Sequence, residues 1–162
     1  MLGFVGQTHG LSRTTRNGKK CQGYFSGSRM AEQNILARAP LVLVAESEPT
    51  ARASLSELLR DEGYLVIETA SSRAAVNQLG SNQNVRIILA NLEMPSWSSI
   101  VKHASAHLPE CFILGMVRYG ALANAVEAQG LGAHGHFVKP LSFTEVNQWI
   151  RRCLGGKIPV TR

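Results

Sequence analysis

The stretch IILANLEMP, residues 87–95, decides how this chain folds. An apolar run ends there in one polar residue, Asn91, and a Met-Pro turn follows. A short continuous apolar run bounded by turn residues is typical of a buried strand, so residues 85–90 are predicted to form one. The end of this strand therefore presents an amide, and the question is what the amide does there.

Four more apolar runs of strand length surround this one. They are residues 41–45, 64–68, 111–116 and 134–138. Each strand is followed by a segment with apolar residues at helical spacing. Strands that are apolar on both faces and alternate with helices imply a parallel sheet covered by helices on each side. The sequence therefore predicts an α/β fold, a doubly wound parallel sheet of five βα units over about residues 41–154.

Helix signals support this pattern. Pro49 suits the first turn of the first helix, and Ser142 with Glu145 forms a capping box for the last helix. Two helices are predicted to bury one apolar face each. These faces consist of Ala51, Leu55, Leu58 and Leu59 in the first helix, and Ala121, Ala125, Val126 and Ala128 in the fourth.

Composition bounds the domain organisation. A chain of 162 residues with 44% hydrophobic content fits one compact domain. Six basic residues against one acid give residues 1–40 a charge of +5, out of a net +6 for the chain. Because this region shows no apolar periodicity, residues 1–39 are predicted to form a disordered leader. A domain is predicted at residues 40–154, and a short tail at residues 155–162. Translation from Met30 stays open, and it would remove most of the basic leader.

Several function classes find no support in the sequence. There is no signal-peptide core and no apolar run of about 18 residues, so a cytoplasmic protein without a membrane span is expected. Cys21, Cys111 and Cys153 are odd in number and far apart, which predicts reduced thiols, the last two buried. His103 and His107 lack a third ligand, so no metal site is predicted.

Polar residues follow the first, third and fifth strands, where doubly wound sheets bind ligands. The segments VLVAESEPTAR (42–52), IILANLEMP (87–95) and GLGAHGHFVKPL (130–141) carry them. In order and spacing they resemble the receiver domain of two-component response regulators, the CheY-like family. The resemblance covers about residues 41–154. It implies a flavodoxin-like (βα)5 fold with strand order 2-1-3-4-5 and a cis Lys139-Pro140 bond.

In receivers, an aspartate after the third strand takes a phosphoryl group from a kinase phosphohistidine. An acidic pair holds Mg²⁺, a lysine and a hydroxyl contact the phosphoryl oxygens, and an aromatic residue switches position. The resemblance assigns these places residue by residue. They are Asn91 for the nucleophile, Glu46 and Ser47 for the acidic pair, Lys139 for the lysine, Met116 for the hydroxyl and His136 for the aromatic residue.

Most of these positions depart from the family pattern. The amide of Asn91 is neither charged nor nucleophilic, and the thioether of Met116 cannot donate a hydrogen bond. Glu46 alone faces Lys139, so the formal charges cancel and Mg²⁺ binding is expected to be weak or absent, with no other cofactor. A Glu46–Lys139 contact with Asn91 hydrogen-bonded between them is predicted instead, and the side chain of Glu93 is expected to face solvent.

The sequence therefore predicts a degenerate pseudo-receiver: a single-domain, non-enzymatic interaction module of phosphorelay signalling. The resemblance implies a partner face on the last strand and last two helices, with Trp149, Arg151 and Arg152 as candidates. A histidine kinase or another signalling protein is the expected partner, and homodimerisation stays open. Two alternatives remain: phosphorylation at a non-standard residue such as Ser47 or Glu93, and nucleic-acid binding by the leader, which is less favoured.

Overall fold

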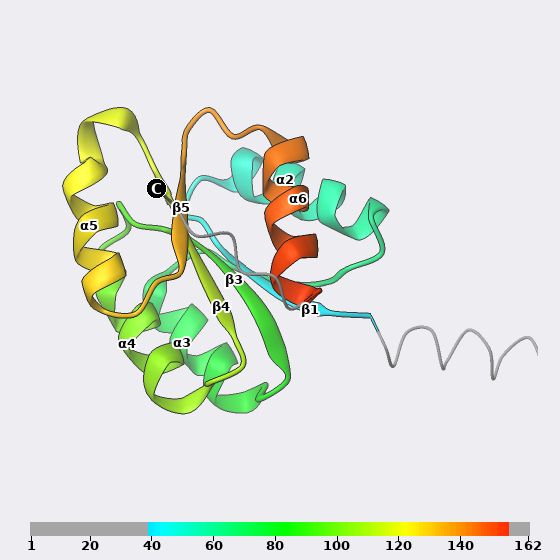
Figure 1. The fold of residues 1–162 in the computed structure, drawn as a ribbon, viewed down its shortest axis with the longest axis horizontal. Coiled ribbons are helices and arrows are strands. Elements are labelled where there is room, and N and C mark those ends of the chain that lie inside the picture. Colours follow the sequence, from blue (N-terminus) through cyan, green and yellow to red (C-terminus); the bar gives the residue numbers. More distant parts are fainter. Residues whose placement is uncertain (1–38, 156–162) are drawn as a thin grey trace, which may run out of the picture. The chain divides into compact units, whose positions relative to one another are not determined.

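The computed structural model describes residues 39–155. In this part of the chain, five parallel strands form one sheet in the order β2-β1-β3-β4-β5 (Figure 1). The strands are β1 (Leu41–Ala45), β2 (Leu65–Thr69), β3 (Val85–Asn91), β4 (Phe112–Val117) and β5 (Gly135–Val138). The predicted doubly wound α/β fold and its strand order are confirmed. The predicted leader, with Met30 and Cys21, and nearly all of the tail lie outside the described residues.

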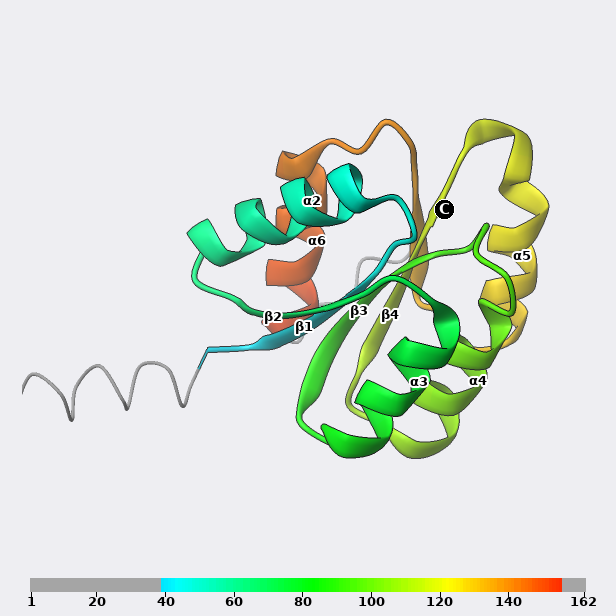
Figure 2. The same ribbon diagram turned by 180° about the vertical axis from the view of Figure 1, so that it is seen from behind.

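Helices cover both faces of the sheet, two on one side and three on the other (Figures 1 and 2). They are α2 (Pro49–Asp61), α3 (Ser72–Ser81), α4 (Ser98–His107), α5 (Leu122–Gly130) and α6 (Phe143–Leu154), with a 3-10 turn, η1 (Tyr119–Ala121), before α5. α2 and α6 pack on one face, while α3, α4 and α5 pack on the other. None of the helices in residues 39–155 is long and apolar enough to cross a membrane.

In residues 39–155, helices α2, α3 and α6 begin at a side chain that caps free backbone N–H groups. The carboxylate of Glu48 accepts hydrogen bonds from the backbone N–H groups of Thr50 and Ala51 at the start of α2. The hydroxyl of Ser142 accepts from the N–H of Glu145 at 3.4 Å, as half of the predicted capping box. These caps fix where α2 and α6 begin, and so they fix the loops that precede these two helices at the carboxyl edge of the sheet.

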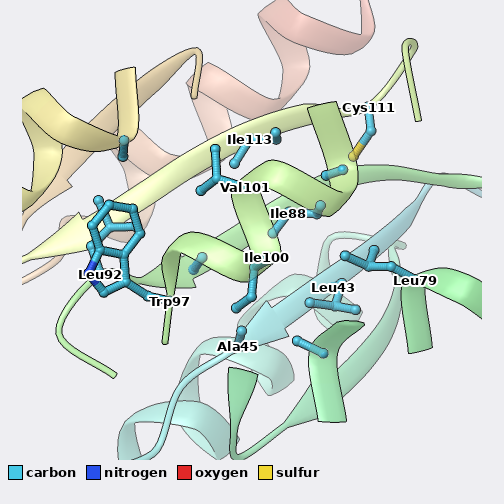
Figure 3. Close-up of a cluster of buried hydrophobic side chains, with 14 of the residues drawn as sticks. Leu43, Ala45, Leu79, Ile88, Leu92, Trp97, Ile100, Val101, Cys111 and Ile113 are labelled. Carbon is cyan, nitrogen blue, oxygen red and sulfur yellow. The ribbon is translucent and has the colours of Figure 1, made fainter. Parts of the chain in front are cut away.

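The core consists of two apolar layers separated by the sheet. Alternate residues of β1, β3 and β4 point into each layer, and most of them are fully buried. Figure 3 shows the layer under α3, α4 and α5. Cys111 lies in this layer and Cys153 in the other, and both are free and buried as predicted. Burial raises the pKa of the Cys111 thiol to about 12, so this thiol stays protonated at neutral pH.

Three predicted core residues, Ala51, Leu58 and Val126, are instead exposed. Leu58 of α2 is 42% exposed and Val126 of α5 is 70% exposed. Ala125 and Ala128 provide the buried contacts of α5, while Leu55 and Leu59 provide those of α2. Helical spacing predicted more buried residues than the structure shows, because each helix buries a stripe that is narrower than its whole apolar face.

Candidate functional site

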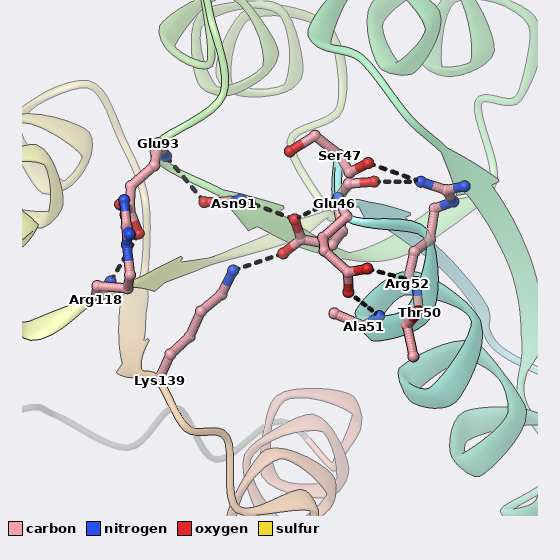
Figure 4. A network of polar contacts seen from close by, with 10 residues as sticks. Glu46, Ser47, Thr50, Ala51, Arg52, Asn91, Glu93, Arg118 and Lys139 are labelled. Carbon is pink, nitrogen blue, oxygen red and sulfur yellow. Dashed lines mark hydrogen bonds and ion pairs between the residues drawn. The ribbon is translucent and has the colours of Figure 1, made fainter.

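Glu46 lies at the centre of the polar site at the carboxyl edge of the sheet (Figure 4). It follows β1 directly and is only 2% exposed. Its Oε2 accepts from the Nζ of Lys139 at 2.6 Å. Its Oε1 accepts from the Nδ2 of Asn91 at 2.9 Å and from the backbone N–H of Glu48 at 3.1 Å. Three donors therefore satisfy one buried carboxylate.

Asn91 is the last residue of β3, and it uses both ends of its amide. Its NH₂ group donates to Glu46, while its Oδ1 accepts from the backbone N–H of Glu93 at 3.0 Å. The predicted Glu46–Lys139 contact is confirmed. Asn91 contacts this pair through Glu46 and also holds the loop after β3, so its amide links the ion pair to that loop.

Lys139 reaches the site because β5 continues straight into it. Its backbone N–H donates to the carbonyl of Val117 at 2.8 Å, which extends the pairing of β5 with β4 by one residue. The Lys139-Pro140 peptide bond is cis, as predicted. The side chain of Lys139 lies across the edge of the sheet toward β1, and 24% of its surface is exposed.

The electrostatics of the site depend on this one ion pair. Burial acts to raise the pKa of the Glu46 carboxyl, but the hydrogen bonds from Lys139, the Glu48 N–H and Asn91 outweigh burial and hold the pKa below its usual value. Glu46 is therefore ionised at neutral pH, and its charge is balanced by Lys139. An ion pair removed from water needs this kind of complete hydrogen bonding to be tolerated.

The donor set does not fit the magnesium site of an intact receiver. Mg²⁺ prefers a near-octahedral shell of oxygen ligands. At the family's acidic pair, Ser47 has no carboxylate, and both oxygens of Glu46 already accept hydrogen bonds. Among residues 39–155, no group of three His, Cys, Asp or Glu side chains is placed to hold a metal ion. In this pocket the charge of Glu46 is balanced by the ammonium group of Lys139.

Ser47 is exposed at the rim of the site. The Nη1 of Arg52 donates to the backbone carbonyl of Glu46 at 2.7 Å and lies 3.4 Å from that of Ser47. The guanidinium of Arg52 therefore holds the loop after β1 against α2. Arg52 carries no signal in the sequence, because its role depends on the fold of that loop.

Glu93 does not face solvent, and that prediction is wrong. Its side chain is 15% exposed and forms a forked ion pair with Arg118, in which Oε2 accepts from Nε at 2.6 Å and contacts Nη2 at 2.5 Å. Its Oε1 accepts from the backbone N–H of Arg118 at 2.9 Å. These hydrogen bonds lower the pKa of the Glu93 carboxyl. The pair joins the loop after β3 to the loop after β4.

The two predicted switch positions point to opposite faces of the sheet. Met116 pairs with Phe137 across β4 and β5, and both side chains lie in the layer under α2 and α6. His136 alternates with Phe137 and so points to the other face. On that face, Val117 is the last residue of β4. Val117, and not Met116, therefore lies on the same face of the sheet as His136, and its side chain is aliphatic.

The three partner-face candidates lie in different surroundings on α6. Trp149 is half-buried, with its ring 6.0 Å from that of Phe137 in an edge-to-face contact. Arg151 turns toward α2, where its Nη2 lies 2.7 Å from Oε2 of Glu62. Arg152 is exposed and, three residues after Trp149, lies on the same side of the helix. Their role in partner binding stays a prediction.

The sheet, its helices and the residues converging at the ends of β1, β3 and β5 define an α/β domain of the CheY-like, flavodoxin-like class. A family model described as "Response regulator receiver domain" matches residues 42–151, more than half of the chain. This protein therefore belongs to the response regulator receiver domain family, which serves two-component signalling.

Individual relatives agree with this placement. The response regulator protein FleR of Pseudomonas aeruginosa is 28% identical over 126 residues, covering 75% of this chain and 26% of FleR. Sporulation initiation phosphotransferase F of Bacillus subtilis is 24% identical over 115 residues, covering 70% of this chain and 92% of that protein. A receiver domain protein from Clostridium thermocellum has a TM-score of 0.68 at 21% identity, covering 72% and 95% of the two chains, which shows the fold alone. The present chain spans about a quarter of FleR.

Proposed function

We propose that this protein is a receiver-type interaction module that works without phosphoryl transfer to its β3 position. The carrying observation is the saturation of Glu46: its two oxygens accept from Lys139, Asn91 and the Glu48 backbone. The lysine that would meet phosphoryl oxygens in a receiver is held by this carboxylate. Asn91 cannot form an acyl phosphate, because an amide nitrogen is not a carboxylate nucleophile.

The charge balance of the pocket supports the same proposal. Phosphoryl transfer relies on positive charge to balance the charge that develops on the transferred group. Here the ammonium of Lys139 and the carboxylate of Glu46 balance each other without a metal. The pocket is thus balanced in charge with no ligand, and its effect would pass through a protein partner such as a histidine kinase or a second copy of the chain.

The test is phosphorylation by a small-molecule donor. The purified full chain is incubated with acetyl phosphate and MgCl₂, and its intact mass is recorded. We expect no mass gain by one phosphoryl group. The matched control is the double variant Ser47→Asp/Asn91→Asp, which restores the second acid and the nucleophile, and which we expect to gain one phosphoryl group. A gain by the natural chain equal to that of the double variant would overturn the proposal.

Phosphorylation at Ser47 is a second candidate, because this hydroxyl is exposed at the rim of the site. Glu93 is a poorer candidate, since both of its oxygens are hydrogen-bonded to Arg118. If the natural chain gains a phosphoryl group, the variants Ser47→Ala and Glu93→Gln identify the acceptor. If Ser47→Ala no longer gains a phosphoryl group while Glu93→Gln still does, Ser47 is the acceptor, and the proposed role without phosphorylation is replaced.

A further inference from the structure

An apolar groove of about 290 Å³ lies beside the Glu46–Lys139 pair. It runs between α2 and the segment that leads from β5 into α6. Ala51, Leu55 and Leu58 form its wall on α2, Leu141 and Phe143 face them, and Met116 also lines it. The three α2 residues recur at intervals of four and three, so they form one stripe along the helix. The exposure of Leu58, which was predicted to be core, is explained by this groove.

The groove has one charged end, which the ion pair provides, and the exposed Ser54 of α2 also lines it. Lys139 carries three N–H donors, of which its hydrogen bond to Glu46 uses one. The lysine side chain remains 24% exposed while that of Glu46 is 3% exposed. The accessible polar group at this end of the groove is therefore a hydrogen-bond donor.

The charge balance decides which ligand suits that donor. Glu46 is ionised and already neutralised by Lys139. An anionic head group would add a second negative charge beside this buried carboxylate, which a site of low polarity disfavours. An uncharged acceptor, such as a carbonyl oxygen, can take a hydrogen bond from the ammonium and leave the ion pair intact.

We propose that this groove binds a small neutral amphiphile: an apolar chain or ring that carries one carbonyl acceptor, with the carbonyl at Lys139 and the apolar part along Leu55 and Leu58. The volume is close to the lower bound of about 300 Å³ for small-molecule pockets. A partner helix would lay apolar side chains along several turns, more than this short groove with one charged end provides.

This inference does not depend on the proposed lack of phosphoryl transfer. Its test uses the full chain with ¹³C-labelled methionine methyl groups and octan-2-one as the probe. Met116 lines the groove, while Met94 is buried in the opposite apolar layer and serves as the internal control. We expect the Met116 methyl resonance to shift saturably with octan-2-one and that of Met94 to stay in place.

Two comparisons make the test specific. Octanoate is expected to bind about tenfold or more weakly than octan-2-one, because its charge meets the buried carboxylate. Leu58→Glu should weaken octan-2-one binding about tenfold or more, since it places a charge in the apolar groove. Leu65→Glu on β2, at an apolar residue of similar exposure, 37%, that does not line the groove, should leave binding unchanged.

Each contrary result would overturn the proposal. If octan-2-one causes no saturable shift of the Met116 methyl resonance, the proposed binding in the groove is refuted. Equal binding of octan-2-one and octanoate would refute the neutral head group. An equal effect of Leu58→Glu and Leu65→Glu would place the probe elsewhere on the surface.

Discussion

Asn91 has an NH₂ group where an aspartate would have a second oxygen, and this group donates to Glu46 at 2.9 Å. An aspartate in the same position would set two carboxylate oxygens against each other inside a mostly buried site. Intact receivers offset such crowding with a bound cation, whereas this chain offsets the charge of Glu46 with Lys139. The amide of Asn91 and the ammonium of Lys139 are thus two of the three donors that satisfy the Glu46 carboxylate.

The first prediction concerns Asn91→Asp. The variant loses the donor to Glu46 and gains a second negative charge, so its free energy of unfolding in EDTA should fall by about 1–3 kcal/mol. MgCl₂ should restore part of that loss, because two carboxylates can share a cation. The natural chain should respond to MgCl₂ no more than the control variant Asn77→Asp, which changes an exposed position on α3. Urea unfolding with and without MgCl₂ measures all three proteins.

The second prediction concerns pH. The pKa of Glu46 is lowered in the folded protein, so the unfolded chain binds a proton at this group more readily than the folded chain does. The resulting stability is complete above the ordinary glutamate pKa of about 4.3 and is lost as the pH falls through the lower folded value. Glu46→Gln, which cannot titrate, should lose less stability than the natural chain between about pH 5 and pH 3.

Urea unfolding at several pH values measures the slope of stability against pH for the natural chain and for Glu46→Gln. Glu46→Gln is expected to be less stable than the natural chain at neutral pH, because the amide of glutamine opposes the donors that surround Glu46. The informative quantity is therefore the slope of stability against pH and not its absolute value. Identical slopes for the two proteins would mean that Glu46 is not held by Lys139 and Asn91 in solution.

At the scale of elements, β4 approaches the loop after β3 closely at Gly115. A Cβ atom added to this glycine would overlap the side chain of Leu92, which is fully buried. The backbone N–H of Leu92 also donates to the carbonyl of Met116 at 3.0 Å. Gly115 thus lets Leu92 lie over β4, directly after Asn91, and this packing fixes the loop that carries Glu93.

The third prediction follows from this contact. Gly115→Ala should destabilise the fold by about 1–3 kcal/mol, the usual cost of overpacking a core. Gly80→Ala is the matched control, since a Cβ there meets nothing within 4 Å; this helical change should stabilise by about 0.5–1 kcal/mol. Adding Leu92→Val to Gly115→Ala should recover part of the loss, and purely additive effects in urea unfolding would contradict the proposed overlap.

The elements were predictable from the sequence because their signals are local. The apolar run before Asn91, the Pro49 turn and the Ser142 cap each act within a few residues. The Glu46–Lys139 pair was predictable from charge once the strand ends were known to meet. The Glu93–Arg118 fork was not, because nothing in sequence indicates how the loops after β3 and β4 approach. The face of the sheet on which Met116 lies was not predictable either, since a one-residue shift along a strand reverses the face.

At the scale of the whole molecule, the edge of the sheet near β5 combines core packing with an open surface. Trp149 contacts Phe137, and a Cβ at Gly135 would lie 3.2 Å from the tryptophan ring. Val126 on α5 and Arg152 on α6 are exposed near the same edge strand. A mutation on this surface can therefore act on the fold or on a partner, and the two effects need to be separated.

The last prediction makes that separation. Trp149→Ala should cost about 2–4 kcal/mol of stability, because it removes a large half-buried ring. Arg152→Glu and Val126→Glu should change stability by no more than about 0.5 kcal/mol, as exposed positions usually do. If α5, β5 and α6 form the partner face, both exposed changes will reduce capture of a signalling partner by the full chain, while Arg73→Glu on α3 will not. If all three exposed variants capture the partner equally well, the partner binds another part of the surface. If only Trp149→Ala loses capture, the loss is explained by unfolding of the domain.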